Sequence, residues 1–135
     1  MTGPVFVDTS AIYAVLDPHD RQNFTAGEIL VDLITSGSTM VTHSAVIHEC
    51  SALVQRRLGM AERRDLHGRL LPLFDIEWVD AAISDRAVSA LMAADRRDAS
   101  LVDWTSFEVM RRRAIRIAFA FHDDFVAQGI DVLAR

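Results

Sequence analysis

Apolar residues recur at helical spacing through much of the chain. Between residues 22 and 36, Ala26, Ile29 and Leu33 fall on one face of a helix, and Gly37 follows where a C-cap glycine belongs. Similar patterns predict helices over 44–58, 61–71 and 100–113, a helix that is capped by Asp80 and runs to about Ala94, and a short last helix from 122–125 to Gly129. The helix after Asp80 is expected to bury an apolar face made of Ile83, Ala87, Leu91 and Met92.

Four short segments between these helices are rich in β-formers, and they cover 5–7, 39–42, 75–79 and 117–121. The first and last are continuously apolar, as strands covered on both faces are, whereas 75–79 alternates and is typical of a sheet edge. Helices that alternate with short strands favour a parallel sheet wrapped by helices. We therefore expect one α/β domain over 1–135, with four to five short parallel strands.

Composition narrows the class of protein. The chain has 135 residues, half of them hydrophobic, which suffices for one buried core. No apolar run approaches the ~18 residues of a membrane span, and the opening MTGPVFVD carries an acid where a signal peptide carries basic residues. The lone Cys50 excludes an internal disulfide and a cysteine zinc cluster. These features predict a cytoplasmic protein with no membrane association.

The charge pattern limits how the chain can bind nucleic acid. The formal net charge is −5, and all 14 basic residues are arginines. Proteins that hold nucleic acid by bulk electrostatics normally have a basic surface, so any such contact here must be local. The absence of lysine also excludes any mechanism that needs a catalytic lysine.

Acidic residues are predicted to gather at one edge of the sheet. Asp8 follows the first strand, and Asp123 and Asp124 follow the last; in a parallel sheet these ends share an edge, where ligands collect. Glu49 lies at the border of an apolar helical arc, and Asp103 lies in the first turn of its helix. At ~5 Å and an effective dielectric of ~20, each like-charged pair costs about 3 kcal/mol, so the cluster needs a proton or a cation. Hard oxygen ligands favour Mg²⁺ or Mn²⁺ over zinc.

Each acid also has a structural alternative. Asp8 can cap a helix, Ser100 with Asp103 fits a capping box, and the 123–124 pair can cap the last helix, while Glu49 can be a surface acid. Hydroxyl side chains stand beside the acids at Thr9, Ser10, Thr105 and Ser106. They can orient the carboxylates, contact a substrate or serve in helix caps. The sequence leaves these roles open.

Four segments together resemble one known family almost end to end. They are VFVDTSAIYAVLD, HSAVIHECSALVQRRLG, SLVDWTSFEVMRRRAI and AFAFHDDF. The chain resembles a PIN domain, specifically the VapC-type toxins of bacterial toxin-antitoxin pairs. The resemblance places family acids at Asp8, Glu49 and Asp103. The family's fourth acid follows the strand phenylalanine, where this chain has His122, with Asp124 or Asp123 as substitutes.

The resemblance implies a Mg²⁺- or Mn²⁺-dependent endoribonuclease that acts as a toxin, forms a homodimer and is inhibited by a VapB-type antitoxin. The metal is expected on Asp8 and Asp103, with Glu49 binding a second ion or positioning water and Asp124 in the fourth place. Replacing either aspartate by asparagine should abolish cleavage and, by removing a repulsion, slightly raise the melting temperature without metal. The imidazole of His122 should face this cleft, favour Mn²⁺ and be protonated when metal is absent.

Three other classes compete with this interpretation. A PIN-like module with weakened catalysis that mainly binds a protein partner or RNA stays open, because the fourth acid is replaced. A phosphorylated receiver domain also groups acids beyond parallel strands, but it needs a lysine that this chain lacks. An RNase H-like nuclease shares the metal chemistry, yet the sequence offers no consecutive hairpin strands.

Overall fold

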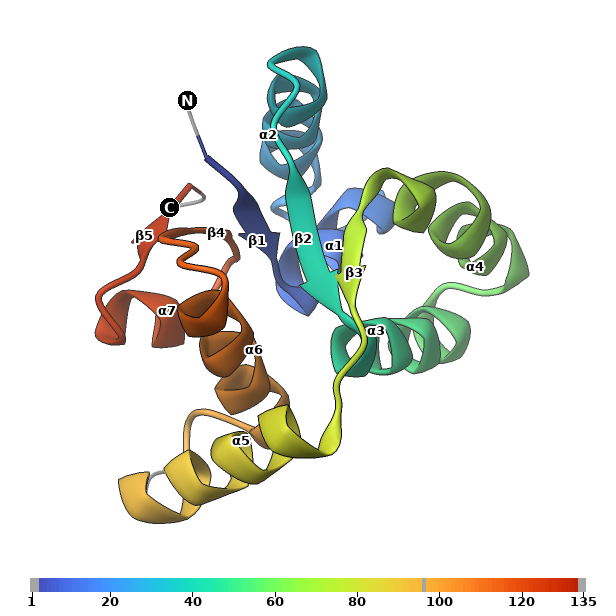
Figure 1. Cartoon of the computed structure of the whole chain (residues 1–135). Helices are drawn as coiled ribbons and strands as arrows, with labels where there is room; N and C mark the ends of the chain where they lie inside the picture. The colour runs from blue at the N-terminus through green and yellow to red at the C-terminus, as the bar shows by residue number, and fades with distance from the viewer. Residues whose placement is uncertain (1–2, 96, 134–135) are drawn as a thin grey trace.

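One parallel sheet organises the molecule, as seen in a computed structural model that describes residues 3–95 and 97–133 (Figure 1). Its strands lie in the order β3-β2-β1-β4-β5. Their bounds are β1 Val5–Val7, β2 Met40–His43, β3 Asp75–Glu77, β4 Ile117–Phe119 and β5 Asp131–Val132. Val5 of the central strand pairs in register with both Met40 and Ile117. Because every pairing is parallel, the carboxyl ends of the strands share one edge.

Helices fill the connections between the strands. They are α1 Thr9–Leu16, α2 Asn23–Thr35, α3 Ser44–Arg57, α4 Met60–Asp65, α5 Ala81–Ala94, α6 Leu101–Arg112 and α7 Asp124–Ala127. α1 and α3 start directly at the carboxyl ends of β1 and β2, and α6 contacts both β2 and α3. α5 packs along α6 and lies away from the strands (Figure 1). None of the helices in the described ranges is long and apolar enough to cross a membrane.

The central strands are the most buried part of the chain. All residues of β1 and β2 are buried, whereas the edge strands β3 and β5 are only partly covered. Aromatic rings fill the space beside β1: Phe6 stacks on Phe125 with the ring centres 6.1 Å apart, and on His43 at 5.7 Å. The carboxyl edge therefore rests on a rigid apolar base, which fixes the residues that leave the strands there.

Most predicted elements are confirmed. The helices predicted over 22–36, 44–58, 81–94 and 100–113 correspond to α2, α3, α5 and α6 within one or two residues, and α7 is the predicted last helix. The edge position predicted for 75–79 is also right, since β3 ends the sheet. On α5 the predicted apolar face is confirmed at Ile83 and Ala87, whereas Leu91 is only partly buried and Met92 is 73% exposed.

Other predictions were incomplete or wrong. No helix was predicted at Thr9–Leu16, and β5 was not anticipated. The helix predicted over 61–71 is broken into α4, a π-helical turn at Leu66–Leu70 and a 3₁₀ turn at Leu71–Leu73. Gly68 and Pro72 explain this break, since glycine weakens a helix and proline cannot donate its backbone hydrogen bond. The last long strand ends at Phe119 and not at residue 121, because its partner β1 turns into α1 at that level.

Candidate metal centre

Asp8 is the acid at the end of the central strand. It caps α1, and its Oδ2 accepts hydrogen bonds from the Ser10 amide at 3.0 Å and from the Ser10 hydroxyl at 2.6 Å. The same hydroxyl accepts a 2.9 Å bond from the Phe121 amide, which ties the chain beyond β4 to the start of α1. The residue is only 3% exposed. The predicted cap and the predicted site residue are therefore one side chain.

The two carboxylate oxygens of Asp103 have different roles, because one belongs to a helix cap and the other faces the site. Its Oδ2 accepts a hydrogen bond from the Ser100 amide at 2.9 Å, and its own amide donates to the Ser100 hydroxyl at 3.2 Å, which completes the predicted capping box. Its Oδ1 lies 3.6 Å from Nε2 of His122. The capping box thus holds one oxygen and leaves the other facing the sheet edge.

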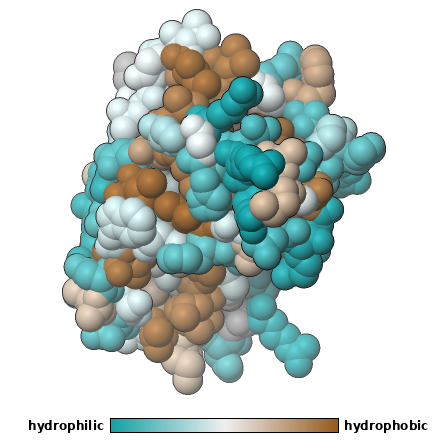
Figure 2. Space-filling view, turned by 90° about the vertical axis from the view of Figure 1, so that its right-hand side faces the viewer, coloured by the Kyte–Doolittle hydropathy of each residue, from teal (hydrophilic) through white to brown (hydrophobic). Residues whose placement is uncertain are grey.

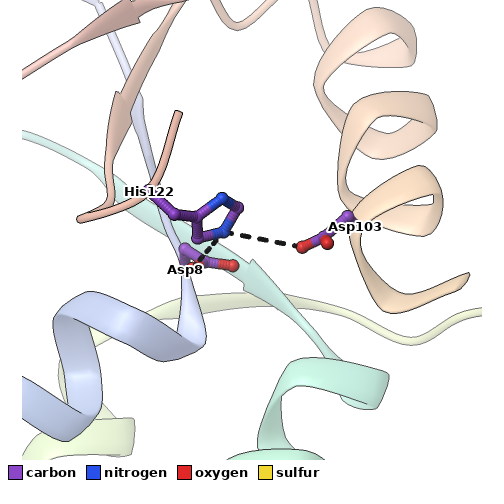
Figure 3. Close-up of side chains that lie close together, drawn as sticks. All are labelled: Asp8, Asp103 and His122. Carbon is purple, nitrogen blue, oxygen red and sulfur yellow. Dashed lines mark ion pairs between the residues drawn. The ribbon is translucent and has the colours of Figure 1, made fainter. Parts of the chain in front are cut away.

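His122 completes this cluster from the loop after β4. Its Nε2 lies 3.2 Å from Oδ2 of Asp8, and Figure 3 shows the ring between the two aspartates. One ligand atom each from Asp8, Asp103 and His122 lies within 4.8 Å of the others, close enough to hold one metal ion. Two carboxylate oxygens and one imidazole nitrogen, partly buried together, suit a divalent cation. The prediction that the imidazole faces the acids is confirmed.

Glu49 reaches the same pocket from α3. Its Oε1 accepts a 2.6 Å hydrogen bond from the Thr9 hydroxyl, and the residue lines a pocket of about 470 Å³ together with Asp8, Asp103 and His122. It is more exposed than its position beside the apolar arc indicated. Glu49 lies outside the three-residue cluster. At this position the carboxylate of Glu49 can bind a water molecule or a second ion.

The two remaining predicted acids lie elsewhere. Asp124 contacts the opposite side of the imidazole, with its Oδ2 3.3 Å from Nδ1 of His122. Asp123 is exposed. The structure therefore does not bring either one into the cluster around Nε2.

The charges of the cluster depend on one another. Hydrogen bonding to Asp8 raises the pKa of His122 to about 9 against the opposing effect of burial, so the ring carries a proton at neutral pH, as predicted for the metal-free protein. Burial alone would raise the pKa of Asp8, but the bonds from His122 and Ser10 outweigh it and lower that pKa. Burial and the charge of Asp8 raise the pKa of Asp103. The repulsion expected at Asp8 is offset by the imidazolium that faces it, since the pKa of Asp8 is lowered despite its burial.

Sequence reasoning missed two residues near the site. Arg56 lines the pocket, and its position seven residues after Glu49 on α3 was the signal, since residues seven apart share a helical face. His43 is buried beneath the edge, where its Nε2 lies 2.8 Å from the Ser106 hydroxyl and links β2 to α6. This pairing spans 63 residues in sequence and has no local signal.

Comparison with known proteins agrees with this geometry. A family model described as "PIN domain" matches residues 5–129. The 23S rRNA-specific endonuclease VapC20 of Mycobacterium tuberculosis, found under two strains, is 34% identical over 126 residues, which cover 93% of this chain and 94% of the relative. The crystal structure of that toxin, described as cleaving the sarcin-ricin loop, superimposes with a TM-score of 0.83 over 93% of this chain and 95% of that chain. FitAcB from Neisseria gonorrhoeae, 20% identical over 95% of both chains with a TM-score of 0.69, shares the fold.

The fold, the acidic edge and the family match define a metal-dependent nuclease class, and this chain belongs to the PIN domain family. Within that family it is of the VapC toxin type, as its four sequence segments predicted. The predicted α/β fold with a short parallel sheet is confirmed at the same time.

Proposed function

We propose that this chain is the toxin of a toxin-antitoxin pair and that it hydrolyses phosphodiester bonds of 23S rRNA at the pocket between α1, α3 and α6. The observation that carries the proposal is the convergence of Asp8, Asp103 and His122 from three distant segments on one small volume. The similarity to VapC20 over almost the whole chain supports the choice of ribosomal RNA as substrate.

In this proposal Asp8, Asp103 and His122 hold a divalent cation. Such an ion lowers the pKa of water and neutralises the charge that builds on the phosphate during displacement. Ser10 and the capping box of Ser100 fix the two carboxylates before any substrate arrives, so little reorganisation is needed. An imidazole ligand favours Mn²⁺ over Mg²⁺, because Mg²⁺ prefers oxygen ligands.

Glu49 has a distinct role in the same proposal. Thr9 donates to one carboxylate oxygen, and the other is left to orient the attacking water or to hold a second ion. Because Glu49 is exposed and lines the pocket outside the three-residue cluster, it can orient a water molecule or hold a second ion beside a substrate phosphate. Replacing it by glutamine should therefore impair cleavage more than binding of the first ion.

Arg56 supplies the local positive charge that a protein of net charge −5 needs for RNA binding. It is the arginine that lines this pocket within the described part of the chain, about 10 Å along the helix from Glu49 at 1.5 Å per residue. We infer that it binds a phosphate that flanks the scissile one. Arg56→Gln should raise KM for RNA and lower the salt slope of binding by about one. Arg64→Gln, an exposed change on α4, is the control and should alter neither.

Apolar side chains on the surface point to protein partners. The most exposed are Phe24 at 76%, Met92 at 73% and Trp78 at 67%. Figure 2 shows apolar residues at the top, in the middle and near the bottom of one face, interspersed with hydrophilic residues. We propose that a second copy of the chain and a VapB-type antitoxin segment cover such surfaces. Sedimentation of the isolated protein as a dimer at micromolar concentration is expected, and a monomer would contradict this part.

Sequencing of RNA ends tests the proposal. Purified protein, freed of its antitoxin, is mixed with ribosomes and Mn²⁺, and new 5′ ends are mapped across all RNAs. We expect one dominant cut in the sarcin-ricin loop of 23S rRNA, which EDTA and Asp8→Asn both remove. Cuts confined to transfer or messenger RNA would overturn the substrate, and absence of any metal-dependent cut would favour the alternative of a weakened module that binds a protein partner or RNA.

A further inference from the structure

We propose that Asp124 is a positioning residue that acts through His122 and does not itself bind the metal. Its Oδ2 lies 3.3 Å from Nδ1 of His122, while Nε2 of the same ring faces Asp8 at 3.2 Å and Asp103 at 3.6 Å. The inference rests on the proposed metal site. It assigns to Asp124 a role different from the fourth ligand that sequence similarity implied.

The first support is a buried nitrogen without a hydrogen bond. Nδ1 of His122 is inaccessible to solvent and has no hydrogen-bond partner of good geometry in the described ranges. A buried N–H of this kind normally finds an acceptor. Asp124 places a carboxylate oxygen at contact distance, and its side chain is only 17% exposed. The contact lies outside hydrogen-bond geometry here, and hydrogen bonds at such sites are often long or poorly aligned before the ligand is present.

The second support is the shape of the imidazole ring. Its two nitrogens point away from each other, so an oxygen that meets Nδ1 lies on the far side of the ring from the atoms around Nε2. The cluster of ligand atoms accordingly contains Asp8, Asp103 and His122 and leaves Asp124 out. Asp124 therefore stands behind the ligand as seen from the metal.

The third support is the chemistry of a histidine in place of an acid. A carboxylate can present either oxygen to a cation, whereas a neutral imidazole has a single lone pair whose position depends on the tautomer. A carboxylate that accepts the proton of Nδ1 fixes the lone pair on Nε2 and holds the ring plane, as in other histidine metal sites. Phe125 also packs against this ring, with the two ring centres 5.1 Å apart.

Titration of Mn²⁺ into the purified toxin by calorimetry tests the proposal. Asp124→Asn should weaken Mn²⁺ binding about 10- to 100-fold, because the amide can stabilise the wrong tautomer. Asp123→Asn removes an equal charge next door at an exposed position and is the matched control. Equal affinity in these two variants would overturn the proposal. A wild-type protein that binds no Mn²⁺ would instead refute the metal site itself.

A double-mutant cycle separates positioning from direct ligation. In a His122→Ala background, Asp124→Asn should produce almost no further loss of Mn²⁺ affinity, because its target is gone. A loss as large as in the wild-type background would show that Asp124 ligates the metal directly. Nitrogen chemical shifts of the Mg²⁺-loaded protein give a second readout: Nδ1 of His122 should carry the proton in the wild type and in Asp123→Asn. In Asp124→Asn the Nδ1 chemical shift should move because the carboxylate acceptor is gone, and an unchanged shift would also count against the proposal.

Discussion

His43 and His122 stand at the same edge of one sheet, and their surroundings drive them to opposite charge states. His43 is fully buried at the end of β2, where burial lowers its pKa to about 4 and keeps the ring neutral. Its Nδ1 accepts from two backbone amides of α3 at 3.2 and 3.3 Å, and its Nε2 meets the Ser106 hydroxyl. His122 is half-buried among carboxylates, which raise its pKa to about 9.

The difference shows which surroundings suit a histidine for metal binding in this fold and which give it a purely structural role. Each ring has a polar group within 3.3 Å of both of its nitrogens, so proximity of polar groups alone does not distinguish them. The partners of His43 are neutral and complete a helix cap, whereas those of His122 are acids that gain from a positive charge at the centre. Only the second arrangement leaves a site that a metal ion can occupy in place of a proton.

The largest expected effect is the loss of RNA cleavage in Asp8→Asn, which should also change the pKa of His122. A bound divalent ion contributes several kcal/mol to the transition state, so its loss should reduce cleavage roughly 10³-fold at neutral pH. The pKa of His122 should fall toward its ordinary value, while that of His43 changes little, because its shift comes mainly from burial. RNA cleavage assays and NMR titration of both rings measure this. Full activity at saturating Mn²⁺ would remove Asp8 from the site.

His43→Ala should affect stability first. The change opens a cavity beside Phe6 and removes three hydrogen bonds, which should lower the free energy of unfolding by about 3 kcal/mol. Metal-free His122→Ala, at a partly exposed position, should cost much less. Urea unfolding in EDTA compares the two. Equal losses would mean that the buried network is not the stronger structural element.

His122→Asp should change the choice of metal. An added carboxylate restores an all-oxygen cluster with Asp8 and Asp103, so the preference for Mn²⁺ over Mg²⁺ should shrink by about tenfold or less. Calorimetry with both ions and cleavage rates in each ion provide the measurement. His43→Asn, which lies outside the cluster of ligand atoms, should keep the wild-type preference. An unchanged ratio in His122→Asp would show that the imidazole is not a ligand.

The two histidines should also shape the pH dependence of stability in opposite senses. The folded-state pKa of His43, about 4, lies below its ordinary 6.5, so stability falls as pH drops from 6.5 toward 4 and the unfolded chain takes up the proton. The pKa of His122 is raised to about 9, so its contribution is present below pH 6.5 and is lost as pH rises through 9. His43→Asn should flatten the acid side and His122→Ala the alkaline side in metal-free melts. An alkaline side unchanged by His122→Ala would contradict the second assignment.

The smallest expected effect is on the melting temperature, which Asp8→Asn and Asp103→Asn should change in opposite directions. Without metal, Asp8→Asn should lower the melting temperature by a few degrees at most, because Asp8 faces the imidazolium and its pKa is lowered. Asp103→Asn should raise it slightly, since burial and Asp8 raise the pKa of that acid. Calorimetric scans in EDTA at pH 7 resolve both. A rise in both variants would restore the simpler picture of acids that only repel one another.

The sequence was informative where one local pattern decides the structure. The apolar period of α2 and the Ser100 capping box of α6 are local, and both were predicted. The strand end at Asp8 was equally clear, because a buried strand stops at a charge. α1 was missed because its eight residues are nearly all apolar or β-branched and show no polar face.

The relation between His122 and Asp124 could not be read from spacing. Two residues apart, where the loop after β4 meets α7, they can face each other or point in opposite directions, and the Phe121 amide that donates to the Ser10 hydroxyl helps to fix this loop at the sheet edge. The role of His43 depends in the same way on how α6 packs over β2. Tertiary contacts between distant segments thus decide which acids meet.

Asp8 caps α1 and Asp103 completes the capping box of α6, and these structural roles bear on how such a gene is inactivated. A single base change in an aspartate codon yields several residues. Asparagine keeps a side-chain oxygen at both positions and glycine is tolerated at an N-cap, whereas alanine or valine at the N-cap costs about 1 kcal/mol. Spontaneous mutants that survive expression of this chain at these two positions should therefore fall into two groups. Asparagine mutants at either position, and glycine at Asp8, should accumulate as folded protein and still sequester antitoxin, whereas alanine and valine mutants should be degraded.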